Sequence, residues 1–428
     1  MNLIRKSLNI LLKEGFYVFI TYLNIWIKRR KFIRFCIQKD WRKASVIGEK
    51  LIKLLPEKIE YYQYLALSYK NLGKNDMASS ILFQGIQKIT SPELLMKKIE
   101  SINFLDDMIR SQFKYMGGEQ NLGCFEHIQN NNDEVKKYIT KISPLSNFEQ
   151  EREFYYQIYK NFEKIRVITP EIISIIEQKS ENLALITMEK IDGIEPNLSR
   201  NILKEVINAS KVINSIKYSG IRNLITPPDF NREFKLVDKN YPNQPIFALH
   251  SFISIHRKHT NQRLFQLVYK RMKELKYTST TFDFIQHLEK LIFDSEVFNQ
   301  INPDFDYTLQ HGDFNNHNMI LDGNRNKLYI IDWGNMCIGP KWIDLAGLFG
   351  QLKLPFNDIS KLFLNNKEEI IDLKPNEKIL FLYALIVTWL IVFSSKELEG
   401  NLDLYLRPAI NEIEFTIKGN MKRLVVDL

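Results

Sequence analysis

Apolar and polar residues follow two different periods along this chain, and the change of period divides it into three parts. Residues 1–100 have a helical pattern throughout and lack glycine-rich strand signals. Alternating or continuous short apolar runs at Val135–Ile142 and Leu183–Lys190 predict strands. Most of 198–300 returns to a helical pattern. We therefore expect a helical domain at 1–100, a β-rich part at 101–190 and a larger, mainly helical part at 191–428.

The helical part contains an internal repeat. Ala44 and Ala78 stand 34 residues apart, each following a similar short polar segment. Residues 25–92 resemble two tetratricopeptide repeats, and an ordinary array of helical hairpins is the alternative. In the first unit, Lys39 stands where these repeats usually have glycine, and Lys28 where they usually have an aromatic residue. The second unit carries the small and large apolar residues of that pattern, namely Tyr62, Leu65, Ala66, Tyr69, Gly73, Ala78 and Leu82.

Two uncharged apolar runs raise the question of whether the chain spans or contacts a membrane. Gly15–Ile27 is aromatic-rich and is followed by the basic cluster Lys28–Lys31, but it is too short to span a hydrocarbon core of about 30 Å. Lys13 and Glu14 interrupt the run upstream and no small-residue cleavage site follows, which argues against a signal peptide. Either an interfacial helix on anionic lipid or a helix packed in the repeat array explains it. Ile379–Phe393 is expected to be a buried helix.

Composition and charge narrow the class of protein. The 428 residues are 45% hydrophobic and 25% charged, which is ordinary for a globular protein. The net charge of +9 favours a negatively charged partner or surface. No basic stripe with interleaved aromatic residues is present, so we expect no nucleic-acid partner. Three cysteines without metal-like spacing indicate a reducing compartment, and we expect a cytoplasmic protein with the inner face of the membrane as its peripheral surface.

The candidate chemistry is concentrated in residues 310–350. Asp313, in His311-Gly312-Asp313, can accept a proton from a substrate hydroxyl. Asn318 follows five residues later, and Asp332 ends the apolar run Leu328–Ile331. Their oxygen atoms suit Mg²⁺, and phosphoryl transfer needs a base and metal ligands positioned together. We expect Asp313 to be the catalytic base, Asn318 and Asp332 to hold Mg²⁺, and ATP to be the phosphoryl donor.

This order of residues resembles the aminoglycoside phosphotransferase and choline kinase family. Protein kinases share the order but usually carry Arg where Gly312 stands. Gly339-Pro340 and Asp344-Leu345-Ala346 extend the match, and in that family the later Asp, here Asp344, steadies the catalytic loop. The resemblance implies an α+β, two-lobed protein-kinase-like fold with a small β-rich lobe and a large α-helical lobe, preceded here by the helical-repeat domain.

Kinases hold the α and β phosphates with a strand lysine that pairs with a helix glutamate. Lys141 is the best candidate on the strand, whereas Lys136 and Lys137 suit solvated edge positions. The next segment, 148–162, reads as a helix. The family's glutamate tends to follow an arginine, which favours Glu153. Glu149 is the alternative, because it lies one turn earlier on the same face, and acidic residues there also suit a helix N-terminus.

Two weaker signals complete the predicted nucleotide site. Gly117 and Gly118 belong to a glycine-rich turn before the Lys141 strand, where backbone N–H groups can approach phosphate oxygens. Met188 and Glu189 lie near the end of an apolar strand that resembles the kinase hinge, whose backbone can bind adenine. We assign these four residues to nucleotide binding.

The segment 198–300 is where the family carries its acceptor-specificity helices. Its basic cluster does not have convincing metal-ligand spacing, so it is either a solvated face or a surface for an anionic acceptor such as an acidic or phosphorylated sugar. The cluster comprises His250, His256, Arg257, Lys258, His259 and Arg263.

The sequence thus predicts an ATP-dependent phosphotransferase that acts on a hydroxyl of a small molecule or saccharide, with surface-glycan or lipid-linked precursors among the acceptors. A repeat scaffold fused to a pseudokinase is one alternative, although intact Asp313, Asn318 and Asp332 argue against it. A protein kinase is another, although Gly312 and the missing Ala-Pro-Glu segment argue against that. The repeats could hold a protein partner, and two units alone should stack on residues 2–24 or on the kinase domain.

Overall fold

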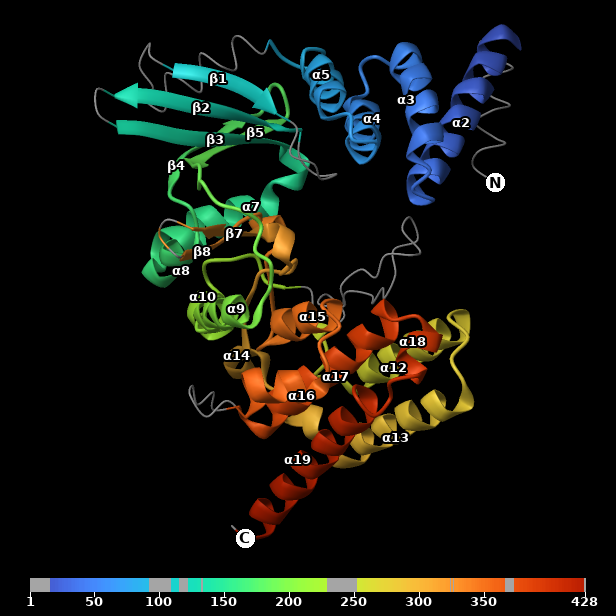
Figure 1. Ribbon diagram of the computed structural model, residues 1–428, viewed down its shortest axis with the longest axis vertical. Helices are drawn as coiled ribbons and strands as arrows, with labels where there is room; N and C mark the ends of the chain where they lie inside the picture. Colours follow the sequence, from blue (N-terminus) through green and yellow to red (C-terminus); the bar gives the residue numbers. More distant parts are fainter. Residues whose placement is uncertain are drawn as a thin grey trace. The chain divides into compact units, whose positions relative to one another are not determined.

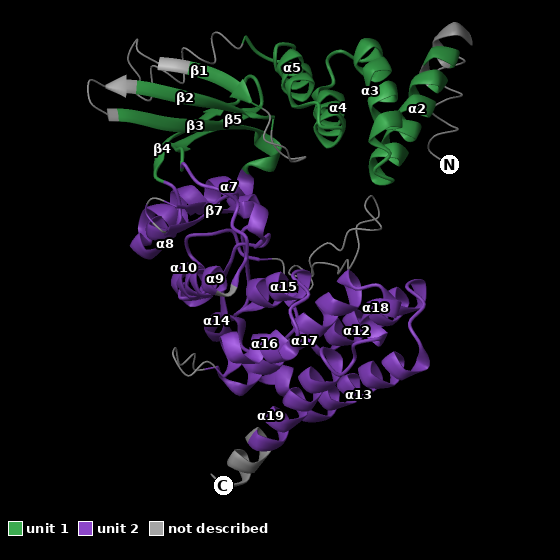
Figure 2. Cartoon of the chain, in the orientation of Figure 1, with its two compact units in different colours: residues 1–148, 171–191 green, residues 149–170, 192–428 purple. Residues whose placement is uncertain are grey.

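The computed structural model describes residues 16–91, 109–114, 122–131, 134–228, 252–323, 325, 327–365 and 373–426. The chain forms two compact units, shown in Figure 2. Unit 1 comprises residues 1–148 and 171–191, and holds an array of helices and a β-sheet. Unit 2 comprises residues 149–170 and 192–428, and contains the predicted catalytic residues Asp313, Asn318 and Asp332.

Unit 1 begins with consecutive helices, each packed against the next (Figure 1). They are α2 (Phe16–Ile37), α3 (Trp41–Leu54), α4 (Ile59–Asn71) and α5 (Asn75–Ile86). Ala44 and Ala78 are buried at corresponding positions of α3 and α5, where their small side chains allow close helix packing. The turns before α3 and α5 also match, because Lys39 and Gly73 both adopt left-handed backbone conformations, with φ of 54° and 74°. The helical N-terminal region is confirmed, and its assignment to tetratricopeptide repeats stays a prediction.

The sheet of unit 1 is antiparallel, with the strand order β1-β2-β3-β5-β4. Its strands are β1 (Ile109–Lys114), β2 (Cys124–Asn131), β3 (Glu134–Pro144), β4 (Ile172–Gln178) and β5 (Leu183–Glu189). The two predicted strands correspond to β3 and β5. Lys141 lies opposite Cys124 and Ile186, so these three side chains share one face.

The other face of the sheet packs against the helical array. Ile86 of α5 is buried in one apolar cluster with Phe125, Ile142 and Leu185 of the sheet. The rings of Phe83 on α5 and Phe113 on β1 are 5.2 Å apart between centroids. The array and the sheet therefore share a hydrophobic core, and the array stacks on the sheet as expected of a short repeat domain that cannot bury its own end.

Unit 2 is mainly helical, with two small two-stranded antiparallel sheets that carry the candidate site. One sheet pairs β6 (Tyr307–Gln310) with β9 (Cys337–Pro340), and the other is a hairpin of β7 (Met319–Asp322) and β8 (Lys327–Ile330). The helices are α7 (Glu149–Glu153), a π-helical segment (Phe154–Tyr159), α8 (Glu163–Ile168), α9 (Arg200–Asn214), α10 (Tyr218–Ile221), α12 (Lys258–Glu274), α13 (Ser279–Ser295), α14 (Pro303–Asp306), α15 (Ile343–Gln351), α16 (Phe356–Ile359), a second π-helical segment (Ser360–Leu364), α17 (Pro375–Val392), α18 (Ser395–Glu399) and α19 (Leu406–Val426).

Helix α17 forms the centre of this unit and contains most of the predicted buried run. Tyr383 and Trp389 are fully buried, and the helix packs against α12, α15 and α19. Within the described ranges it is the one helix long and apolar enough to cross a membrane, yet 78% of its apolar window is buried inside the protein. This burial is what a core helix requires. The predicted α+β fold, with a β-rich small lobe and a helical large lobe, is confirmed.

Candidate active site

The predicted catalytic loop connects β6 to β7, and two asparagines hold its aspartate, Asp313. Nδ2 of Asn315 donates to Asp313 Oδ1 at 2.7 Å, and Nδ2 of Asn318 donates to Asp313 Oδ2 at 2.9 Å. Asn318 Nδ2 also donates to the backbone carbonyl of Asp313 at 2.8 Å. Since the amide nitrogen faces Asp313, the amide oxygen of Asn318 faces away from it. The structure thus brings the predicted base and one predicted metal ligand into direct contact.

His311 ties this loop to the segment that carries Asp332. Its Nε2 lies 2.9 Å from the carbonyl oxygen of Ile331, and its Nδ1 accepts from the backbone N–H of Asp313 at 3.3 Å. Burial lowers the pKa of His311, which favours the neutral ring with the proton on Nε2. The backbone N–H of Ile331 also donates to the carbonyl of Asn318 at 3.0 Å. These bonds fix residues 313, 318 and 331 relative to one another.

Asp332 occupies a strained turn beside a buried ring. Its φ is +61°, in the left-handed region that non-glycine residues seldom adopt. Trp333 next to it is fully buried and stacks on Phe154 at 3.9 Å between centroids, while the ring of His311 lies 4.7 Å away. Packing of Trp333 holds this turn in place, and Asp332 itself is exposed.

Asp344 and Gly312 determine the course of the loop. The carboxylate of Asp344, at the start of α15, accepts from the backbone N–H groups of His311 at 2.6 Å and Gly312 at 3.2 Å. Burial raises the pKa of Asp344 to about 7. Gly312 has a φ of +83°, and a Cβ there would lie 1.9 Å from the carbonyl oxygen of Asn335. This contact explains why glycine, and not the arginine of protein kinases, precedes Asp313.

Unit 1 carries the predicted nucleotide residues that belong to the sheet. Lys141 is half-buried on the face of β3 opposite the face that packs against α5. Met188 is buried and Glu189 half-buried at the end of β5. Gly117 and Gly118 lie outside the described residues. The sheet register is compatible with a phosphate-binding lysine on a face that the helical array leaves uncovered.

The three glutamates of the acidic helix α7 differ in exposure and in hydrogen bonding. The carboxylate of Glu153 accepts a hydrogen bond from the backbone N–H of Thr226, and Glu149 is exposed. Glu151, which the sequence reasoning did not single out, is only 2% exposed. Beside it, burial raises the pKa of Tyr155 far above its ordinary range, with the charges of Glu151 and Asp332 adding to the effect.

A sequence signal for Glu151 did exist. It stands three residues after Phe148 and four before Tyr155, which places it on the apolar face of the helix. A carboxylate on such a face needs a partner, because burying an unpaired charge is costly. Glu153 and Glu149 stay predictions as the lysine partner, and Glu151 joins them as a candidate.

The basic cluster of the acceptor region separates into two environments. His256 is half-buried, its Nδ1 lies 3.0 Å from the hydroxyl of Tyr307, and burial lowers its pKa to about 4, so it is neutral near pH 7. Lys258, His259 and Arg263 are exposed, and His250 lies outside the described residues. In the part of the chain that the structure describes, no three His, Cys, Asp or Glu side chains gather as a metal site.

Comparison with known proteins identifies the family. Residues 127–358, more than half of the chain, match the phosphotransferase enzyme family. The chain belongs to this family, and it is therefore a kinase, a phosphotransferase with an alcohol group as acceptor. The matched range contains the whole catalytic loop, Asp332 and Asp344. No curated protein sequence gives a significant match.

Several solved structures have a distantly similar fold. An ethanolamine kinase from Plasmodium vivax shows 14% identity and a TM-score of 0.42, over 79% of this chain and 88% of that one. A spectinomycin phosphotransferase in complex with ADP and spectinomycin shows 16% identity and a TM-score of 0.37, over 77% and 97%. A choline kinase from Streptococcus pneumoniae shows 14% identity and a TM-score of 0.35, over 76% and 98%.

Proposed function

We propose that this kinase transfers the γ-phosphoryl group of ATP to a hydroxyl of a small molecule or saccharide, with Asp313 as the base. The single observation that supports this most is the carboxylate of Asp313, which two side-chain amides hold in one orientation at the start of a loop. In this role Asp313 accepts the hydrogen bond of the acceptor hydroxyl and then its proton, while the hydroxyl oxygen attacks the γ-phosphorus.

The residues present fit a magnesium ion. Asn318 offers an amide oxygen and Asp332 a carboxylate, and Mg²⁺ in kinases is usually held by one or two such groups together with phosphate oxygens and water. When bound, the ion neutralises charge on the transferred phosphoryl group. The hydrogen bond between Ile331 and Asn318 keeps these two ligands on neighbouring segments. Lys141, paired with a glutamate of α7, would position the α and β phosphates, and the backbone at Met188 and Glu189 would bind adenine.

The acceptor class that we propose is anionic, such as an acidic or phosphorylated saccharide or a lipid-linked or surface-glycan precursor. The net charge of +9 and the exposed Lys258, His259 and Arg263 support this, because they would attract an anion and repel a polycation.

The experiment that tests the proposal is a mass-spectrometric acceptor screen with full-length protein, Mg-ATP and three groups of hydroxyl compounds, which are cationic, neutral and anionic. Choline, ethanolamine and an aminoglycoside represent cations, neutral sugars form the second group, and uronic acids and sugar phosphates the third. We expect a product heavier by one phosphoryl group from the third set, and at least about a hundredfold less of it with Asp313→Asn. Binding of ATP without any product would favour the pseudokinase scaffold, and a product only from the cations would refute the anionic acceptor.

We also propose that α2 brings the enzyme to the cytoplasmic face of a membrane. Ile20 and Ile27 are exposed on this helix, and Lys28–Lys31 follow directly. Apolar side chains beside cations suit the surface of anionic lipid. Co-sedimentation with phosphatidylserine vesicles should fall strongly for the double variant Ile20→Ser with Ile27→Ser. If the protein instead binds one partner protein in the absence of vesicles, a partner on the repeats is favoured. No binding to these vesicles at low salt would contradict the membrane role.

A further inference from the structure

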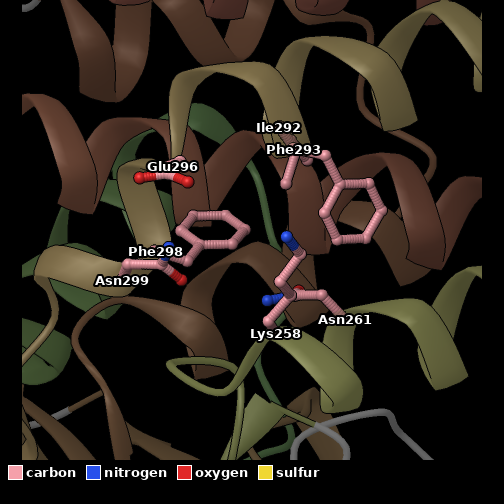
Figure 3. Close-up of a pocket in the computed structure, with 7 residues that line it drawn as sticks. All are labelled: Lys258, Asn261, Ile292, Phe293, Glu296, Phe298 and Asn299. Carbon is pink, nitrogen blue, oxygen red and sulfur yellow. The ribbon is translucent and has the colours of Figure 1, made fainter.

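Unit 2 contains a cavity whose lining includes none of the residues assigned to the transfer reaction. It has a volume of about 420 Å³ and lies between the end of α9, the strand β6, the two residues that precede α15 and the start of α17. Small-molecule sites have volumes of roughly 300–1,000 Å³. The cavity shown in Figure 3, between α12 and α13, has only about 10 Å³ and could hold one water molecule at most. Size therefore singles out the larger cavity as a ligand site.

The lining of the larger cavity is cationic. It contains four lysines and two carboxylates. Lys374 lies 3.2 Å from Asp306, and Lys341 lies 3.6 Å from Glu377. The other two lysines are Lys211 and Lys217. Among the described residues, the wall thus carries two more positive than negative charges, and a ligand with a phosphate or carboxylate group would complement it.

Trp342 in the wall has two unusual features. Its indole N–H is buried without an acceptor among the described residues, and the whole side chain of Trp342 is only 2% exposed. A buried donor without an acceptor is costly, and this N–H has no surface open to the cavity. Trp342 also has a φ of +70°, which is rare for a bulky residue and concentrates at functional positions.

The cavity wall connects to the catalytic loop through Asn214. The Oδ1 atom of Asn214, which lines the cavity, accepts from Thr308 Oγ1 at 3.0 Å, from Gln310 Nε2 at 3.2 Å and from the backbone N–H of Trp342 at 2.9 Å. Gln310 precedes His311, and Trp342 lies two residues before Asp344, which holds the loop. A ligand that contacts Trp342 would therefore affect both segments that anchor the catalytic loop. These are the strand that ends before His311 and the segment that leads to Asp344.

We propose that this cavity binds an anionic small molecule through a phosphate or carboxylate group, and that binding orders the catalytic loop through Trp342 and Asn214. The site is separate from the acceptor and nucleotide residues, so the inference stands or falls independently of the transfer reaction. The ligand would act as a regulator that the protein senses in addition to its substrates.

Calorimetry on the full-length protein tests the binding. Glucose 6-phosphate and citrate serve as anionic probes, inorganic phosphate as the minimal one and glucose as the neutral control, all at equal ionic strength. We expect binding of the anions but not of glucose, and a loss of roughly tenfold or more in affinity in the double variant Lys217→Met with Lys341→Met, since each removed charge typically contributes one or more charge-assisted bonds. Lys290→Met, on the exposed side of α13 and outside the cavity, should bind like the parent protein.

Hydrogen exchange separates this site from the active site. The amides of His311 and Gly312 should exchange several-fold more slowly with bound glucose 6-phosphate in the parent protein and in Asp313→Asn, but not in the double lysine variant. Equal affinity of the double lysine variant and the parent, or no binding of any of the three anions, would overturn the proposal. Binding that leaves the exchange of both amides unchanged would overturn its link to the loop.

Discussion

Gly312 and Asn335 approach so closely that a methyl group on Gly312 would lie 1.9 Å from the carbonyl oxygen of Asn335. The neighbouring atom belongs to the backbone, which cannot rotate away as a side chain can. The N–H of the same glycine donates to Asp344, and the candidate base Asp313 is the next residue. This one contact therefore fixes both the residue type at position 312 and the point from which Asp313 extends.

Gly312→Ala should destabilise the protein and reduce transfer. A left-handed conformation costs a residue with a Cβ about 1–2 kcal/mol, and the clash with Asn335 adds to this cost. We expect the free energy of unfolding, measured by urea titration, to fall by at least about 2 kcal/mol. Gly220→Ala is the control, because a Cβ at Gly220 meets no atom within 4 Å. A Gly312→Ala protein with unchanged stability would show that the loop follows another course.

Asp344→Asn should change how stability depends on pH. The pKa of Asp344 is raised from 3.8 to about 7 in the folded protein, so between these values the folded state holds a proton that the unfolded state has released. The contribution of Asp344 to the free energy of unfolding is full below about pH 4 and falls by about 1.4 kcal/mol per pH unit until about pH 7.

Urea titrations between pH 5 and pH 8 measure this slope. The difference in unfolding free energy between Asp344→Asn and the parent should shift in favour of the variant as the pH rises to 7, and then stay constant. Parallel profiles for the two proteins would mean that Asp344 titrates normally in the fold.

Lys39 and Gly73 give a paired test of the repeat. Both residues are left-handed at equivalent turns, and a Cβ at Gly73 meets no atom within 4 Å, so backbone conformation alone should determine the effect. Lys39→Gly should raise the free energy of unfolding by roughly 0.5–1 kcal/mol, and Gly73→Ala should lower it by about 1 kcal/mol. Changes of the same sign in the two variants would contradict the equivalence of the turns.

The shared core predicts that the sheet depends on α5. Ile86 is fully buried against the sheet, so Ile86→Ala should cost about 2–5 kcal/mol of unfolding free energy. Met77→Ala on the same helix is the control, because Met77 is 44% exposed and its loss should matter by less than about 0.5 kcal/mol. Deletion of residues 1–91 should give an insoluble protein. A soluble, folded deletion protein would show that the sheet does not need the helical array.

The contacts of the predicted catalytic segment are local. Asp313, Asn315 and Asn318 lie within six consecutive positions, and their spacing determines which side chains can meet. Asp344 required family knowledge, since it acts on backbone groups more than 30 residues earlier. The burial of Glu151 was not anticipated, because several glutamates share one turn and only the phase of the helix distinguishes them.

Long-range packing could not be predicted from the sequence. Asn214 is an isolated residue at the end of α9, and nothing near it in the chain indicates that it accepts from Thr308, Gln310 and Trp342. Likewise, Phe83 and Phe113 are apolar residues in different elements, and a periodic pattern shows which face is buried but not what covers it.

The rate of phosphoryl transfer by Asp313→Asn tests the central claim most directly, using the acceptor that gives product in the mass-spectrometric screen. Asp358→Asn, an exposed residue of α16, is the matched control. Calorimetric binding of ADP should be unchanged in both variants. The account predicts a fall in kcat of about 10²–10⁴-fold for Asp313→Asn and none for Asp358→Asn. Near-parental turnover by Asp313→Asn would contradict the account, because Asp313 would then not be the base.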